Sequence, residues 1–340
     1  MRSDDITSIT HKNHYVPQFY LKNWSRDGKK IWVYSLLVPH HKIPYWQEKS
    51  IDYTACWNDF YTRCNGEQEA DEFEKWFNSE FETPTEPIIK KLIQGKAISK
   101  QEHIILTHYI MAQDMRVPAR VNFVLGSAKR ALSNFLDSFS FENVKKEDII
   151  NCYNRNENDD LLPINIHIDR EKSEIELNTF VGKSVYLYAL KSLLTSTVKK
   201  VEHYKWRVVQ ASEDISFPTS DDPVIRLNFN NKFDYDFNGG WGKKHSNIIM
   251  PISPKCLLFT EIGAKTKMTN LDCSKEWSEF FRKIIIEHAY RFVYADSRQR
   301  GMLSINPRRV NKKLYQEEQK TMSGWHEYNL KAEQEILEKN

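Results

Sequence analysis

The sequence has few cysteines and no long apolar run. Its five cysteines are odd in number and mostly isolated: Cys56, Cys64, Cys152, Cys256 and Cys273. The best candidate for a membrane span, IILTHYIMA at 104–112, is too short to cross a bilayer and contains His108. No apolar segment leads the chain, so these features together predict reduced thiols in a cytoplasmic protein without a membrane partner.

A strong excess of charge of one sign is also missing. The formal net charge is +3, far from the surplus that is typical of an obligate nucleic-acid-binding protein. Local basic clusters, GKKH at 242–245 and NPRRVNKK at 306–313, still allow nucleic acid or an acidic partner to bind. The commoner alternative is that both clusters are ordinary solvated surface.

The familiar catalytic motifs are absent from the sequence. It contains no Gly-rich phosphate loop, no dinucleotide-binding fingerprint, no HExxH helix and no nucleophile elbow. Any active site must therefore be inferred from polar residues that a hydrophobic core does not require.

The composition and the order of patterns predict an α+β fold. Hydrophobic residues make up 40% of the chain and aromatic residues 13%, which is ample for a packed core. Helical spacing fills about 66–200, whereas strand-like runs cluster at both ends of the chain. We expect one domain over 1–340, with a β-rich part at about 204–296 and a charged helix at about 308–338.

Two local patterns predict particular elements. The aromatic run HYVPQFYLKNWS and the run IWVYSLL flank Asp27-Gly28, which predicts a hairpin of strands 15–24 and 31–37 that joins the later sheet. Ser99 and Glu102 form a capping-box pattern, which predicts a helix over about 100–115. A further helix is expected over about 179–199.

Two stretches carry cationic candidates for chemistry. In NHYVP, His14 could act as an acid, a base or a ligand, or it could simply bond to the backbone near the start of the hairpin. In MAQDMRVPAR, Arg116 comes at the end of the expected helix, where a cation is favoured. Its guanidinium could grip a phosphate or carboxylate, or it could pair with an acid such as Glu82 or Asp114.

The stretch FPTSDDPV places polar residues between two apolar runs, where a strand ends. Asp221 or Asp222 could bind a metal or take a proton, and Ser220 could hold a phosphate or a backbone amide. The alternative is a tight turn, because Ser, Asp and Pro are common turn residues.

Taken together, these stretches resemble the bacterial DUF4238 family, which is defined by sequence and has no assigned biochemical role. HYVPQFYLKNWS is similar to the family's opening HYVPxxYLxxF signature, with Trp24 where phenylalanine is usual. FPTSDDPV resembles its [FI]-x-TSD-x-P stretch. The segments ETPTEPIIKKL, MRVPAR, PISPKCLL and AYRFVYA resemble its weaker elements.

The resemblance implies a single DUF4238-like domain whose signature residues meet in one pocket. Those residues are His14, Glu82, Arg116, Ser220 and Asp221, with Asp222 in reserve. We expect Glu82 and Asp221 to hold Mg²⁺ or Mn²⁺, His14 to serve as general base and Arg116 to steady a phosphate.

Two functions of different classes follow from that set. The first is a metal-dependent nuclease, a hydrolase that could act as a toxin or an anti-phage defence effector. The second is a binding or scaffold protein without turnover, which recognises nucleic acid, an anionic ligand or a protein partner.

Overall fold

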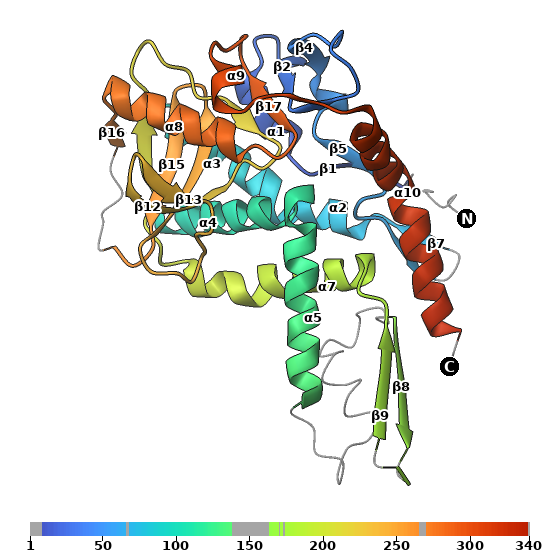
Figure 1. Cartoon of the computed structure of the whole chain (residues 1–340). Helices are drawn as coiled ribbons and strands as arrows, with labels where there is room; N and C mark the ends of the chain where they lie inside the picture. The colour runs from blue at the N-terminus through green and yellow to red at the C-terminus, as the bar shows by residue number, and fades with distance from the viewer. Residues whose placement is uncertain are drawn as a thin grey trace, which may run out of the picture.

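The computed structural model describes residues 9–65, 68–137, 163–169, 171–172, 174–264 and 270–338. Figure 1 shows two sheets at one end of the molecule and the helices of the chain's middle beneath them. A two-stranded hairpin, β8 (Ile164–Asp169) with β9 (Glu174–Thr179), projects from the opposite end. The α+β class is confirmed.

The larger sheet has six strands in the order β13-β12-β14-β15-β10-β16. Its strands are β10 (Arg207–Gln210), β12 (Ile225–Asn231), β13 (Asp234–Asp236), β14 (Ser246–Ser253), β15 (Cys256–Glu261) and β16 (Asn270–Asp272). Along β14, Ile248 and Met250 pack into one core cluster, whereas Ile249 between them packs into another. Side chains alternate along a strand, so both faces of this sheet are buried. Helix α8 (Lys275–His288) covers the face to which Ile249 points.

The smaller sheet joins the two ends of the chain. Its strand order is β11-β17-β2-β4, made of β11 (Thr219–Ser220), β17 (Phe292–Ala295), β2 (Lys30–Ser35) and β4 (Trp46–Ser50). Strand β2 pairs antiparallel with β17 on one side and with β4 on the other. The N-terminal region therefore joins later strands through β2.

The expected hairpin of 15–24 with 31–37 is wrong. Residues after Pro17 form helix α1 (Gln18–Leu21) and the 3₁₀ turn η1 (Lys22–Trp24), and the hairpin partner of β2 is β4. Tyr20 and Trp24 are four residues apart, so one helical face buries both, at 0% and 1% exposure. Their polar atoms are satisfied as well, because Tyr20 Oη donates to the Pro251 carbonyl and Trp24 Nε1 to the Phe217 carbonyl.

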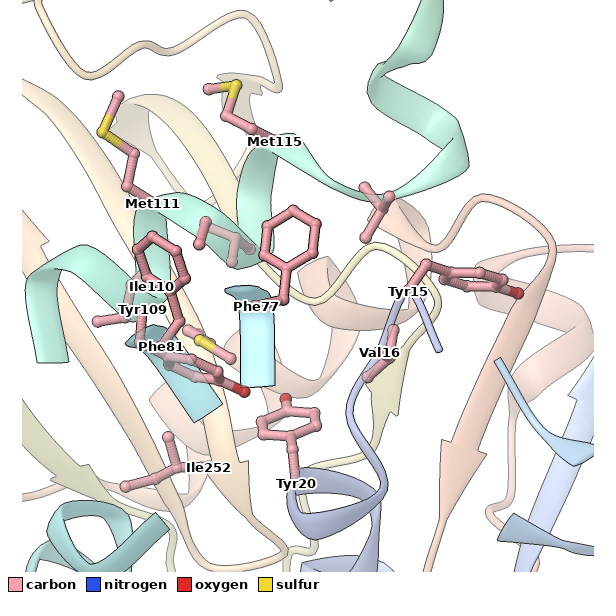
Figure 2. Packing of buried hydrophobic residues seen from close by; sticks show 14 of the residues in the cluster. Tyr15, Val16, Tyr20, Phe77, Phe81, Tyr109, Ile110, Met111, Met115 and Ile252 are labelled. Atoms are coloured by element: carbon pink, nitrogen blue, oxygen red, sulfur yellow. The ribbon is translucent and has the colours of Figure 1, made fainter. Parts of the chain in front are cut away.

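The helical middle packs beneath the six-stranded sheet. Its elements are α2 (Glu72–Trp76), the π-helical segment η3 (Phe77–Glu82), α3 (Thr83–Ile93), α4 (Lys100–Met115), the 3₁₀ turn η4 (Pro118–Arg120), α5 (Val121–Asp137), α7 (Lys183–Ser192), the π-helical η5 (Leu193–Thr197) and the 3₁₀ turn η6 (Val198–Val201). Figure 2 shows rings of Tyr20, Phe77 and Phe81 beside α4 residues in this core. The helix expected from 179 begins only at Lys183, because β9 continues to Thr179.

Helix α4 has the bounds that the capping box predicts. Ser99 Oγ accepts a hydrogen bond from the Glu102 amide at 3.2 Å, and the Ser99 amide donates to Glu102 Oε2 at 2.7 Å. We expect Ser99→Ala to lower the free energy of unfolding by about 1 kcal/mol, because one amide of the first turn loses its partner. Thermal unfolding measures this, with Ser323→Ala inside a later helix as the control. An unchanged melting temperature in Ser99→Ala would contradict the capping role.

The remaining described elements are short, apart from one long C-terminal helix. They are β1 (Lys12–His14), β3 (Leu37–Val38), η2 (Ile51–Tyr53), β5 (Cys56–Asn58), β6 (Arg63–Asn65), β7 (Gln68–Ala70), α9 (Met302–Ile305), β18 (Arg309–Val310) and α10 (Lys312–Leu337). Helix α10 lies along the side of the molecule near β5 (Figure 1), where Trp57 Nε1 donates to the Met322 carbonyl at 2.7 Å. Within the described ranges, no helix is both long and apolar enough to span a bilayer.

Candidate functional site

A polar cleft of about 490 Å³ opens where β1 and α1 meet α2 and the π-helical segment η3. We call it the polar cleft. Its charged and amide side chains include Lys12, His14, Gln18, Glu74, Lys75 and Glu82. The first three precede or open α1, and the others come from a helical stretch about sixty residues later, so tertiary packing creates the cleft.

His14 is held at the end of β1, which pairs with β5. Its ring Nε2 lies 3.2 Å from the Asp52 carbonyl oxygen and 3.3 Å from the Gln18 side-chain nitrogen. Because the Asp52 carbonyl can only accept, we place the proton of the neutral ring on Nε2 and the lone pair on Nδ1. The Gln18 amide nitrogen can only donate, so it makes no hydrogen bond to Nε2 in this tautomer. Burial lowers the pKa of His14 below its usual 6.5, although the Asp52 hydrogen bond acts in the opposite direction. His14 is therefore neutral at pH 7.

Glu74 is the second titratable group of the polar cleft, and the sequence did not single it out. Burial raises its pKa to about 7, with the charge of Glu82 adding to the rise and the charge of Arg116 opposing it. The His14 backbone amide lies 3.5 Å from Glu74 Oε1, so the two residues adjoin. A carboxyl group with this pKa can hold or release a proton near neutral pH.

Glu82 forms an ion pair with Arg116 at the inner side of the polar cleft. Arg116 Nη1 donates to Glu82 Oε1 at 2.7 Å, and Arg116 Nε donates to Gln113 Oε1 at 3.2 Å. The Arg116 guanidinium also lies 5.0 Å from the ring centre of Phe77. Glu82 ends the π-helical segment, a local widening of the helix that is often found at functional sites.

Arg116 is only 1% exposed, so it lies behind Glu82 and does not line the polar cleft. From the sequence, an ion pair with Glu82 was the alternative to phosphate binding by Arg116. In this position Arg116 orients the Glu82 carboxylate instead of contacting a molecule bound in the cleft. Its Nη2 has no hydrogen-bond partner within the described part of the chain.

Ser220 and Asp221 lie elsewhere, at the end of β11, and neither lines the polar cleft. The Asp221 carboxylate accepts the backbone amides of Tyr290 at 3.0 Å and Arg291 at 2.8 Å, which links the turn to the start of β17. Ser220 Oγ accepts from the Asp222 amide at 3.2 Å. Burial raises the pKa of Asp221 to about 7 against these hydrogen bonds. The contacts are those of a tight, buried turn.

The five expected site residues are thus divided between two places. His14 and Glu82 line the polar cleft with Arg116 behind them, whereas Ser220 and Asp221 belong to the turn. Glu82 and Asp221, the expected pair of metal ligands, do not share the cleft. Among the described residues, no group of three or more His, Cys, Asp or Glu side chains is arranged to hold a metal ion.

Asp222 belongs to a third set of residues, which we call the buried charge network: Asp114, Arg120, Asp222, Arg226 and His288. Arg120 donates to Asp114 Oδ1 at 3.0 Å and lies 3.3 Å from Asp222 Oδ2. His288 Nδ1 donates to the Asp222 carbonyl oxygen, and its Nε2 accepts from Arg120 at 3.3 Å. Burial lowers the pKa of His288 to about 3, in agreement with a neutral ring.

Asp222 makes the stability of the protein depend on pH. Burial, aided by the charges of Asp114 and Asp221, raises its pKa to about 8 against the pull of Arg120. The pKa of Asp222 is higher in the folded than in the unfolded protein. Its contribution to stability is therefore present in full below pH 4 and is lost as pH rises through 8. The loss is about 1.4 kcal/mol per pH unit inside that window.

We therefore expect the melting temperature of the wild type to fall more steeply than that of Asp222→Asn between pH 6.5 and 8.5. The range avoids the opposite contribution of His288, whose lowered pKa removes stability as pH falls from 6.5 towards 3. Asp214→Asn, an exposed change, is the control. If the melting temperatures of the wild type and Asp222→Asn change in parallel with pH, Asp222 is not the titrating group.

The sequence marks only some of the additional residues that the structure brings to these sites. Asp114 and Arg120 stand in the same MAQDMRVPAR stretch as Arg116, and their charge pattern around Pro118 is the signal that could have marked them. Glu74 stands among other acids in EADEFEKW, where nothing distinguishes it from Glu72. Glu74 differs from Glu72 only in the folded protein, where it is half-buried beside His14 and Glu72 is exposed.

Comparisons with known proteins identify a family. No match was found among the curated proteins or among the solved structures. A family model described as "Protein of unknown function (DUF4238)" matches residues 12–299, which is most of the chain. The match includes the polar cleft, the buried turn and the buried charge network. The chain belongs to the DUF4238 family.

Proposed function

We propose that the polar cleft is a hydrolytic site that cleaves phosphodiester bonds of nucleic acid. The observation that carries the proposal is the pair His14 and Glu74, adjoining groups whose pKa values are shifted in opposite senses at one open cleft. Such opposed shifts are typical of residues that divide acid and base roles.

In this proposal the neutral His14 is the base and protonated Glu74 is the acid. His14 Nδ1 takes a proton from the attacking water while the water oxygen bonds to phosphorus. The bond from phosphorus to the leaving oxygen breaks, and Glu74 gives its proton to that oxygen. Transfer of one proton from His14 to Glu74 restores both groups for the next turnover.

Glu82 is the carboxylate that would receive a divalent cation in this cleft. Mg²⁺ is commonly held by one or two carboxylates together with waters and substrate phosphates, so a complete set of protein ligands is not required. The hydrogen bond from Arg116 orients the Glu82 carboxylate. In this proposal the ligands of the cation are Glu82 and the substrate phosphate, in place of the expected pair Glu82 and Asp221.

Nucleic acid is the proposed substrate because cations lie beside the reacting groups. Lys12 and Lys75 line the same cleft as His14, together with the carboxylates of Glu82 and Glu86. Lys12 can meet a phosphate directly, whereas Lys75 is paired with Asp71 at 2.7 Å. The segment with Lys312 and Lys313 adds exposed cations at the start of α10. A nuclease of this kind would suit the toxin or anti-phage role expected from the sequence.

The test incubates the purified protein with labelled RNA and DNA in Mg²⁺, Mn²⁺ or EDTA. We expect cleavage by the wild type, and the EDTA reaction decides whether the cation takes part. Absence of cleavage under every condition, with a normally folded protein, would overturn the hydrolytic proposal. Retention of labelled RNA or DNA on the protein without cleavage would instead support the non-catalytic binding function.

A further inference from the structure

A second cavity, of about 920 Å³, lies between α4, α5, α7 and the segment 237–241. We call it the apolar cavity, because its walls include Met111, Met115, Val124, Ala189 and Leu193. Figure 2 shows Met111 and Met115 extending from the same side of α4, away from Phe81. The volume is within the range of about 300–1,000 Å³ that small-molecule pockets occupy. The apolar cavity and the polar cleft share no lining residue.

One end of the apolar cavity is cationic. Arg120 and Arg226 of the buried charge network line it. Arg226 is 8% exposed, and its Nε has no hydrogen-bond partner within the described part of the chain. That nitrogen forms an ion pair with Asp114, whose Oδ2 lies 3.7 Å away, beyond hydrogen-bond distance. The Arg226 guanidinium also lies 5.0 Å from the ring centre of Phe123, a wall residue of the cavity.

The carboxylate of Asp114 is already engaged by other donors. Arg120 Nε donates to its Oδ1 at 3.0 Å, and Trp241 Nε1 donates to its Oδ2 at 2.7 Å. Arg120 is held by Asp114 and also lies 3.3 Å from Asp222 Oδ2. Arg226 Nε therefore remains as a buried donor at this end of the cavity without a hydrogen-bond acceptor within the described part of the chain.

We infer that the apolar cavity binds a small amphipathic molecule with one anionic head group. The apolar body lies against the methionines of α4 and the facing walls from α5 and α7, and the head accepts a hydrogen bond from Arg226. An unpaired buried donor is unfavourable, and an anionic oxygen satisfies it with a charge-assisted hydrogen bond. This ligand site is additional to the proposed nuclease site.

The test measures binding of dodecanoic acid and its methyl ester by calorimetry. The wild type is expected to bind the acid more tightly than the ester, because only the acid carries a charge for Arg226. Arg226→Gln is expected to weaken binding of the acid by roughly 10-fold to 100-fold and to leave the ester unchanged. Arg300→Gln, a change of an exposed arginine, is the matched control.

A second variant tests the apolar part and keeps the experiment decisive if Arg226→Gln does not fold. Ala128→Trp places a large ring on the cavity wall of α5 and is expected to weaken the acid and the ester alike. The inference is overturned if the wild type binds neither probe. It is also overturned if the acid and ester bind equally, or if a folded Arg226→Gln or Ala128→Trp binds the acid as the wild type does.

Discussion

Glu74→Gln is expected to lower the rate of phosphodiester cleavage by about 10²–10⁴-fold, the usual contribution of a general acid or base. Glutamine keeps the size and the hydrogen-bonding capacity of the side chain but has no proton to donate at pH 7. His14→Gln is expected to have an effect of the same order. In the wild type, the rate should fall as pH rises through about 7, where Glu74 loses its proton.

The measurement is the initial rate of cleavage of labelled RNA or DNA, with unfolding followed in parallel. Glu80→Gln is the matched control for Glu74→Gln, because Glu80 is exposed on the same helical stretch. His203→Gln is the exposed control for His14→Gln. Wild-type rates in both Glu74→Gln and His14→Gln would remove the polar cleft from the mechanism, even if the protein cleaves nucleic acid.

Arg116→Met is expected to destabilise the protein by about 3 kcal/mol, because it leaves the Glu82 carboxylate without its partner. Methionine retains much of the apolar packing against Phe77, so loss of volume is a minor part of the effect. Chemical denaturation measures the free energy of unfolding. Arg130→Met, at an exposed position of α5, is the control and is expected to change stability little.

The combination Arg116→Met with Glu82→Gln isolates the ion pair. If the pair is the cause, the double variant is more stable than the sum of the two single effects predicts, since neither change leaves a charge unpaired once the other is present. Additive effects, or a loss below about 0.5 kcal/mol in Arg116→Met, would mean that the buried contact contributes little.

Local elements of this fold could be predicted because their information is local. Ser99 and Glu102 satisfy each other's neighbouring amides, so the start of α4 depends on four consecutive residues. Strand pairing depends on distant segments instead. Residues 15–24 are aromatic enough for a strand, yet Tyr20 and Trp24 are buried on one helical face against residues about two hundred positions later. No pattern within the segment itself could decide between those outcomes.

The candidate site divides in the same way. Sequence patterns and the family resemblance selected His14, Glu82 and Arg116, and the structure brings Arg116 into direct contact with Glu82 and His14 into the same cleft as Glu82. The same patterns selected Ser220 and Asp221, whose polar atoms bond to the backbone of a buried turn. Polar residue types at strand ends serve turns and sites equally well, so their type alone does not separate the two uses.

By itself, the sequence determined the α+β class, the membership of the family and the bounds of its well-capped helix. Only the tertiary structure decided which acidic side chains have the burial and the neighbours that shift their pKa values. Glu74 and Glu72 are equivalent in the sequence, but Glu72 is exposed, whereas Glu74 is half-buried beside His14, and the loss of hydration raises its pKa to about 7. The physical reason is that the charged form of a side chain is stabilised by water and by neighbouring charges. Both depend on residues that are far away in the chain and meet only in the folded protein.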